Sequence, residues 1–236
     1  MKKKNVIMRV ASVLGLAVLL TTCAISGTFA KYTTSDSNSD TPRVAKFGVT
    51  VTANGEMFAT SYANEESIGT TAVGEGSSVL SSDSDKLVAP GTKGTLANAK
   101  ITGTPEVAVR VSYDATLTLD GWTVDSAEYC PLIIKVGNET YGLTGMEDSA
   151  GSSATQIATD IADLKSKVET AIENYSADYA AGTNLSEIGA TGYVSVSWEW
   201  AFDVSEENDV KDTKLGNATT PATITLAITT TVTQIN

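Results

Sequence analysis

The chain contains no histidine among its 236 residues. Without an imidazole, no Ser-His-Asp or Cys-His catalytic pairing can form, and no zinc site of the His-Glu-x-x-His kind can be built. Two carboxylates could still serve a glycosidase, and the 28 acidic residues make chance pairs unavoidable. None of them stands in a distinctive sequence setting. The sequence therefore predicts no enzyme, no catalytic residue, no cofactor and no metal.

Basic residues and cysteines are also few. Lysine and arginine number 16 against 28 acidic residues, a formal net charge of −12, which disfavours binding to nucleic acid or to anionic lipid. The two cysteines are Cys23 and Cys130. Cys130 lies in an apolar run and is predicted to be a small buried side chain, with a reactive thiol as the alternative.

The first thirty residues have the composition of a secretory signal peptide. A basic start over residues 2–9 precedes an uncharged apolar run over 10–24, and small residues follow up to Ala30. The apolar run is shorter than the roughly 20 residues that a membrane-spanning helix needs. We therefore expect cleavage between Ala30 and Lys31, and a secreted product without a membrane anchor.

Lipid attachment at Cys23 is the alternative for this region, although Thr22 departs from the small residues that normally precede a lipidated cysteine. Cleavage after Ala30 would remove four basic residues and no acidic one, which leaves 12 basic against 28 acidic residues and a formal charge of −16. Only Cys130 would remain, so no intrachain disulfide is possible and stability must come from packing or from assembly.

Residues 31–43 are polar and rich in Ser, Thr and Asp, so this segment cannot bury enough apolar surface to order itself. Residues 55–85 are rich in Gly and Ser and predict loops with one short strand near 57–62. Between residues 205 and 218 the chain is acidic, which predicts a looped connection. Alternating apolar and polar residues predict strands over 44–53, 94–102, 106–119, 193–202 and 222–235.

Residues 129–143 predict a β-hairpin, because Gly137 stands at the first position of a two-residue turn and suits type II′. Asp120-Gly121 predicts a turn after the strand 106–119. A different period runs from about 153 to 181, where apolar residues recur every three or four positions. This period predicts an amphipathic helix of about 25 residues, capped by Ser152 or Ser153 and ended by Gly182, with its apolar stripe packed on the sheet.

Three acidic stretches are candidates for binding a sugar or a calcium ion. Glu199 lies between Trp198 and Trp200, where aromatic rings could form a sugar site, but alternation in a strand places Glu199 on the face opposite both rings. We predict core-facing tryptophans and a solvent-facing glutamate. The clusters at 83–85 and at 206–212 could supply oxygen ligands to calcium, but neither has the spacing of an EF-hand loop, and solvated acidic loops are the simpler interpretation.

Together the strands favour a mainly β fold, a two-sheet antiparallel sandwich with one inserted helix at about 153–181. The predicted organisation is a signal peptide (1–30), a flexible N-terminal segment (31–43) and a β-sandwich domain (44–236).

Several stretches resemble one family of secreted proteins, those related to TasA and camelysin, which Gram-positive bacteria export through a dedicated signal peptidase of the SipW type. These stretches are GTFAKYT at 27–33, AKFGV at 45–49, LVAPGTKG at 87–94 and WEW at 198–200. Two others, GTPEVAV at 103–109 and DTKLG at 212–216, resemble clostridial members in particular.

The resemblance implies a jelly-roll-like β-sandwich that polymerises into extracellular or biofilm-matrix fibres. It implies donor-strand complementation, in which the N-terminal segment of one subunit completes a sheet of the next. A polar, unfolded segment beside a sandwich is what such β-augmentation requires, although a merely flexible tail is the alternative. Tyr32, the only large ring in the segment, is the candidate anchor. The expected donor residues are Lys31, Tyr32, Thr33, Thr34, Ser35, Asp36, Ser37, Asn38, Ser39, Asp40, Thr41, Pro42 and Arg43.

Some members of this family have been labelled metalloproteases, but a chain without histidine lacks the ligands of such a site. The expected partners are further copies of the same chain, with cell-wall or accessory matrix proteins beside them, and the expected location is the extracellular matrix or the cell surface. The alternative is a monomeric surface adhesin or carbohydrate-binding module, and a hydrolase comes third.

Overall fold

The computed structural model describes residues 43–52, 57–63, 77–83, 85–96, 100–188, 193–202 and 204–236. The chain divides into two compact units, Met1–Ala45 and Lys46–Asn236. Only residues 43–45 of the first unit are described, so the fold given below is that of the second. This unit is mainly β, with several antiparallel sheets, which confirms the predicted fold class. The jelly-roll-like strand order remains an expectation.

The larger sheet has five strands in the order β11-β10-β9-β13-β4, and all neighbours are antiparallel except β10 and β11. Strands β9 and β10 form the predicted hairpin, in which Glu139 pairs with Val136 and Gly137 has a φ of +59°, as primed turns require. The strands are β4 (Lys93–Leu96), β9 (Leu132–Val136), β10 (Glu139–Leu143), β11 (Gln156–Ala158) and β13 (Val196–Trp200).

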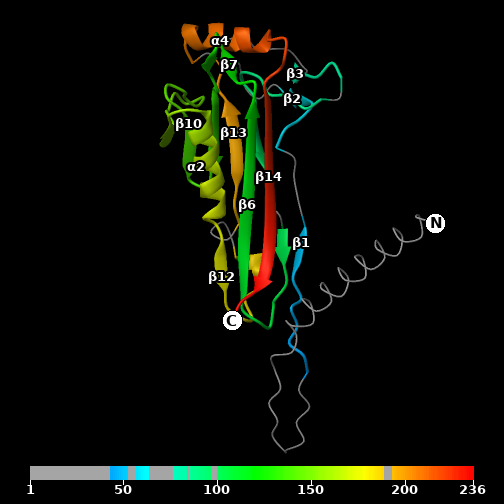
Figure 1. The fold of residues 1–236 in the computed structure, drawn as a ribbon. Coiled ribbons are helices and arrows are strands. Elements are labelled where there is room, and N and C mark those ends of the chain that lie inside the picture. Colours follow the sequence, from blue (N-terminus) through cyan, green and yellow to red (C-terminus); the bar gives the residue numbers. More distant parts are fainter. Residues whose placement is uncertain are drawn as a thin grey trace, which may run out of the picture. The chain divides into compact units, whose positions relative to one another are not determined.

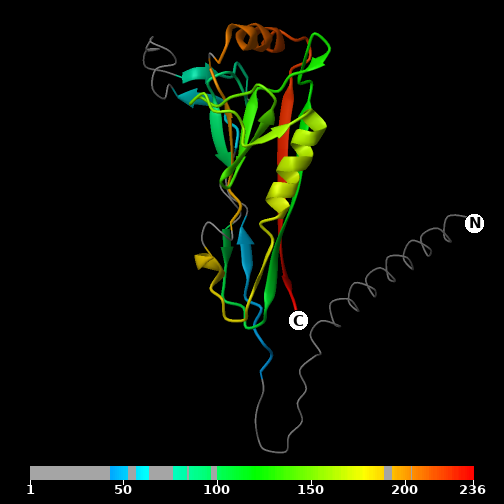
Figure 2. The ribbon, with the colours of Figure 1, turned by 90° about the vertical axis from the view of Figure 1, so that its left-hand side faces the viewer.

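The second sheet has the order β12-β6-β14 and contains the two longest strands. β6 (Val109–Asp120) and β14 (Thr223–Gln234) pair over their whole length without a bulge, from Thr223 opposite Asp120 to Gln234 opposite Val109. Figures 1 and 2 show the two strands side by side. β12 (Ala177–Tyr179) pairs only with the first three residues of β6.

Three two-stranded ladders and a 3-10 turn complete the described unit. Gly121, at a φ of +77°, makes the predicted turn after β6 and leads into β7. The ladders join β1 (Thr50–Thr52) to β5 (Lys100–Thr102), β2 (Ser61–Ala63) to β3 (Ser77–Leu80) and β7 (Thr123–Val124) to β8 (Ala127–Glu128), and the turn η1 is Leu185–Glu187.

Three predicted strands differ from expectation in their bounds, and the one expected at 193–202 is reduced to β13 (Val196–Trp200). The strand expected at 44–53 is reduced to β1, because Gly48 adopts a φ of +52°, which interrupts extended backbone before β1 begins. The strand expected at 94–102 is two strands, since β4 pairs with β13 whereas β5 pairs with β1. Residues 97–99, between them, lie outside the described ranges.

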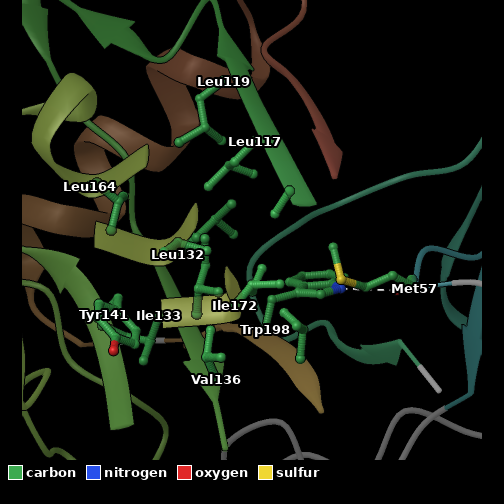
Figure 3. Close-up of a cluster of buried hydrophobic side chains, with 14 of the residues drawn as sticks. Met57, Leu117, Leu119, Leu132, Ile133, Val136, Tyr141, Leu164, Ile172 and Trp198 are labelled. Carbon is green, nitrogen blue, oxygen red and sulfur yellow. Dashed lines mark hydrogen bonds between the residues drawn. The ribbon is translucent and has the colours of Figure 1, made fainter. Parts of the chain in front are cut away.

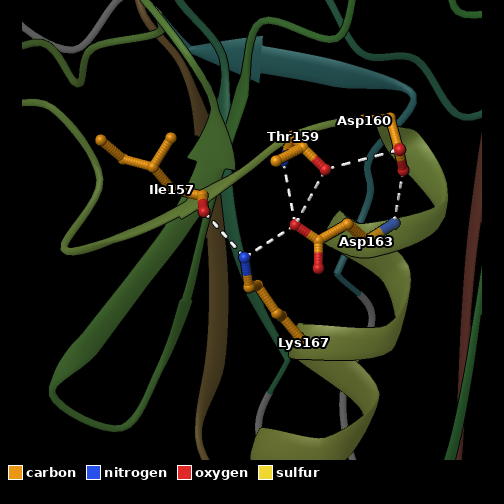
Figure 4. Close-up of polar contacts among 5 residues, drawn as sticks. All are labelled: Ile157, Thr159, Asp160, Asp163 and Lys167. Atoms are coloured by element: carbon orange, nitrogen blue, oxygen red, sulfur yellow. Dashed lines mark hydrogen bonds and ion pairs between the residues drawn. The ribbon is translucent and has the colours of Figure 1, made fainter.

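The predicted helix of about 25 residues is wrong in length, because α2 spans Ile161–Glu173. Asp160, not a serine, is its N-cap and accepts a hydrogen bond from the Asp163 N–H at 2.8 Å, while the Asp163 carboxylate accepts one from the Thr159 N–H at 2.9 Å. Lys167 completes this cluster by donating to Asp163 and to the Ile157 carbonyl (Figure 4). The reciprocal cap starts the helix at Ile161.

The stripe of α2 packs on the sheet as predicted, since Leu164, Val168 and Ile172 are completely buried. The residues at the two ends of the predicted helix belong to strands instead. Ile157 lies in β11 and is 50% exposed, and Tyr179 lies in β12. The segment between residues 205 and 218 is not a loop but a second helix, α4 (Glu206–Gly216), because Ser205 caps its first turn and acidic residues in that turn favour the helix N-terminus.

One core joins both sheets and α2, and it includes residues far apart in the sequence such as Met57, Leu117, Leu132 and Trp198 (Figure 3). Cys130 belongs to this core with no exposed surface, which confirms its predicted burial. Burial raises the pKa of its thiol to about 12, so the reactive thiolate is suppressed.

Candidate strand-docking edge

Among the residues that the structure describes, the three-stranded sheet is covered on the side of α2 and has no further strand beyond β14. The inward-facing side chains of β6 are all buried, from Val109 with no exposure to Ala115 at 8%. The inward-facing side chains of β14 pack against the same core but are only half-buried, although they lie opposite the buried row of β6. These half-buried apolar residues are Ile224, Leu226, Ile228 and Val232.

The direction of the backbone groups of β14 follows from the contacts of β6. Tyr113 and Leu117 donate their N–H groups toward α2 and β12, to the Ser176 hydroxyl at 3.1 Å and the Glu169 carboxylate at 2.7 Å. In an antiparallel strand, alternate residues point their N–H and C=O groups to opposite sides. The odd-numbered residues of β6 therefore face away from β14, and the even-numbered residues face toward it.

Because even residues of β6 lie opposite odd residues of β14, the odd residues of β14 form the ladder between the two strands. The hydrogen bond from the Ile235 N–H to the Ala108 carbonyl, at 2.9 Å, follows the same rule, since it also joins an odd-numbered residue on the β14 side to an even-numbered residue on the β6 side. The even residues of β14 therefore point their N–H and C=O groups away from β6. We call this row the outer edge of β14; it comprises Ile224, Leu226, Ile228, Thr230, Val232 and Gln234.

Within the described ranges, no strand pairs with the outer edge of β14. β1 approaches β14, but its ladder is with β5. β14 has the sequence TITLAITTTVTQ and contains no charge, proline or glycine, although the chain carries a net charge of −12. Natural edge strands are usually protected by charges, prolines or bulges. A long edge without such protection is suited to pairing with another strand.

The prediction for the Trp198-Glu199-Trp200 strand is confirmed for the two core-facing rings and for the opposite face of the glutamate, but Glu199 is half-buried and not fully solvent-facing. Trp198 and Trp200 are buried at 2% and 4% exposure, and Glu199 lies half-buried on the opposite face of β13. The Glu199 carboxylate accepts a hydrogen bond from the Ser149 N–H at 2.9 Å. The rings and the carboxylate therefore do not line one common sugar site.

The acidic clusters have structural contacts of their own. Asp83 accepts hydrogen bonds from the Ser81 hydroxyl and the Asp85 N–H, which closes a turn. Glu207 pairs with Lys211 on the exposed side of α4 at 2.6 Å. Across the described ranges, no three acidic or cysteine side chains are grouped so that they could hold a metal ion.

Asp212 has a role that the sequence did not indicate, because it points inward from α4. Its carboxylate accepts hydrogen bonds from the Tyr129 hydroxyl at 2.6 Å and from the Trp200 Nε1–H at 3.1 Å. Burial raises the pKa of Asp212, and the neighbouring Asp209 adds to this effect, which exceeds the lowering by the two hydrogen bonds. Burial, together with Asp212, also raises the pKa of Tyr129. This cluster fastens α4 to the end of the sandwich.

We expect Asp212→Asn to change how stability depends on pH. Because the pKa of Asp212 is raised in the folded state, folding favours its protonated form, and the wild type loses stability as pH rises from the ordinary aspartate value of about 3.9 through the raised pKa. The variant cannot titrate there. Urea unfolding of both proteins from pH 3 to pH 7 should show the wild type gaining on Asp212→Asn toward acid. A difference that stays constant with pH would contradict the cause assigned to the shift.

The expected donor segment falls almost entirely outside the described ranges, as do the cleavage residues Ala30 and Lys31. Of the donor residues, only Arg43 is described, and its guanidinium donates to the Val44 carbonyl at 3.5 Å. No described helix combines the length and the apolar character needed to cross a membrane. Comparisons with protein-family models, curated proteins and solved structures find no match to this chain.

Proposed function

We propose that the protein is a secreted structural subunit, without catalytic activity, of an extracellular or biofilm-matrix fibre. Residues 31–43 of one copy add as a donor strand to the outer edge of β14 in the next copy. The observation that supports this assignment is the long, uncharged edge of β14, with which no strand of the described residues pairs, beside a half-buried apolar row. An added strand would satisfy the backbone groups of this edge and cover the row.

The proposed contact also predicts the form of the assembly. A donor segment at one place and an acceptor edge at another make a heterologous contact, which produces open filaments and not closed rings unless the rotation closes. Each backbone hydrogen bond contributes roughly 0.5–1.5 kcal/mol net. A donor segment paired along Ile224 to Gln234 can therefore hold a subunit with few side-chain pockets, which suits the polar composition of residues 31–43.

Deletion of residues 31–43 tests this function. We expect the truncated protein to give the circular dichroism spectrum of a folded β protein and to remain monomeric by light scattering, because the described core does not include the deleted residues. Negative-stain microscopy should show filaments for the intact secreted protein and none for the truncated protein.

A synthetic peptide with the sequence of residues 31–43 provides the control. It should bind the truncated protein and, in excess, should stop filament growth by the intact protein, whereas a peptide of the same composition in scrambled order should do so less well. Filaments of normal width from the truncated protein would place the joint elsewhere on the molecule. An intact protein that stays monomeric under all conditions would favour the adhesin alternative.

A further inference from the structure

The opposite edge of the same sheet carries a different set of contacts. The N–H groups of odd-numbered β6 residues point away from β14, as derived above, so they would form a second edge. Along this edge, β12 pairs with β6 from Val109 to Val111, the Ser176 hydroxyl accepts from Tyr113, and the Glu169 carboxylate accepts from Leu117. The chain from α2 to β12 thus supplies three kinds of hydrogen-bond partner for this edge of β6: backbone groups, a hydroxyl and a carboxylate.

The covering segment is fixed in place from both sides. Leu164, Val168 and Ile172 of α2 are completely buried, and α2 contacts β6, β9, β10 and β11, so the helix closes this side between the two sheets. At the other end, Arg110 of β6 and Asp178 of β12 form a bidentate ion pair with distances of 2.6 and 2.8 Å. In Figure 1, α2 and β14 lie on opposite sides of β6.

We infer that Glu169 and Ser176 are specificity-determining residues for assembly, because they occupy backbone donors of the β6 edge and so leave the outer edge of β14 as the open edge of this sheet within the described ranges. This inference rests on the proposed function and deepens it. A subunit with two open edges in one sheet could take two strands, which would join filaments sideways. With the β6 edge covered and the β14 edge open, this sheet can accept one donor strand and not two.

The test compares two double variants of the intact protein. In Glu169→Ala with Ser176→Ala, both side-chain acceptors are lost; in Glu169→Gln with Ser176→Thr, both are kept. Amide hydrogen exchange should be at least about tenfold faster at Leu117 and Tyr113 in the alanine pair, and close to wild type in the conservative pair. Microscopy should show widened or branched filaments for the alanine pair and filaments of normal width for the conservative pair.

Failure of this inference can be separated from failure of the proposed function. If the wild type forms no filaments, the proposed function fails. The inference about the β6 edge can then still be tested by light scattering, in which the alanine pair should form larger oligomers than the conservative pair. Faster exchange at Leu117 and Tyr113 without any change in filament width, branching or oligomer size overturns the inference. So does unchanged exchange at both amides. If the alanine pair does not fold by circular dichroism, the single variants Glu169→Ala and Ser176→Ala, each of which removes one of the two acceptors, should show the lateral association in weaker form, and its absence from both counts against the inference.

Discussion

Replacing Thr230 with proline is expected to abolish filament growth while leaving a folded, soluble subunit. Thr230 belongs to the outer edge of β14, so its N–H points away from β6 and is not part of the ladder between these strands. Proline lacks this donor and places its ring where the neighbouring strand would approach. Proline is tolerated on edge strands for the same reason. The substitution therefore removes the acceptor surface and keeps the ladder with β6.

The adjacent residue supplies a matched control. Thr231 points its N–H toward β6, where it lies opposite Ser112, so Thr231→Pro should break the ladder and destabilise the fold by on the order of 1–3 kcal/mol. Urea unfolding should rank wild type close to Thr230→Pro and well above Thr231→Pro, while microscopy should show that only the wild type forms normal filaments. Normal filaments from Thr230→Pro would show that the donor strand does not bind at β14.

The long strands could be predicted because their evidence is local. In 106–119 and 222–235 an apolar residue recurs at nearly every second position, and both stretches form strands at nearly the predicted bounds, as β6 and β14. The hairpin at 129–143 was predictable for a similar reason, since Gly137 marks a two-residue turn between two apolar runs. The alternation of apolar residues and the residue preferences of a turn each involve only a few neighbouring positions, so both can be recognised in a single sequence.

The helices show where local evidence was insufficient. Over residues 153–181 the apolar spacing fits a helix throughout, but the parallel pairing of β11 with β10 and the antiparallel pairing of β12 with β6 take up both ends. Such tertiary contacts override the helical period. The sequence did hold a signal for α4 that composition concealed, because Ser205 is followed by acidic residues in the first turn, an arrangement typical of a helix start.

The candidate site depends on strand order, which a single sequence does not contain. The uncharged composition of β14 is visible in the sequence, but whether this strand lies at an edge or in the centre is decided by its neighbours in the sheet. The same holds for Glu169, whose contact with Leu117 joins residues 52 positions apart. The inward position of Asp212 could not be predicted, because its partners, Tyr129 and Trp200, come from other parts of the chain.

Substitution of Gly94 by alanine is expected to destabilise the fold strongly. A Cβ at Gly94 would lie 2.1 Å from the Met57 carbonyl oxygen and 2.6 Å from Trp198 Nε1. These two atoms form a buried hydrogen bond of 2.9 Å, which ties the segment before β2 to β13 (Figure 3). The added methyl must separate them, and one of the two obstacles is backbone, which cannot turn aside as a flexible side chain could.

The expected cost of Gly94→Ala is on the order of 2–5 kcal/mol, from overpacking and from a buried indole N–H left without its acceptor. Urea unfolding should show this loss, and tryptophan fluorescence should shift to the red if Trp198 gains contact with water. Gly216→Ala is the matched control, because no atom lies within 4 Å of its added Cβ and alanine is favoured in a helix. Equal stability of the two variants would mean that the Met57–Trp198 hydrogen bond does not stabilise this part of the sandwich. The position of the Trp198 ring would then depend on the rings of Phe58 and Tyr62, whose centroids lie 5.3 and 6.2 Å from it.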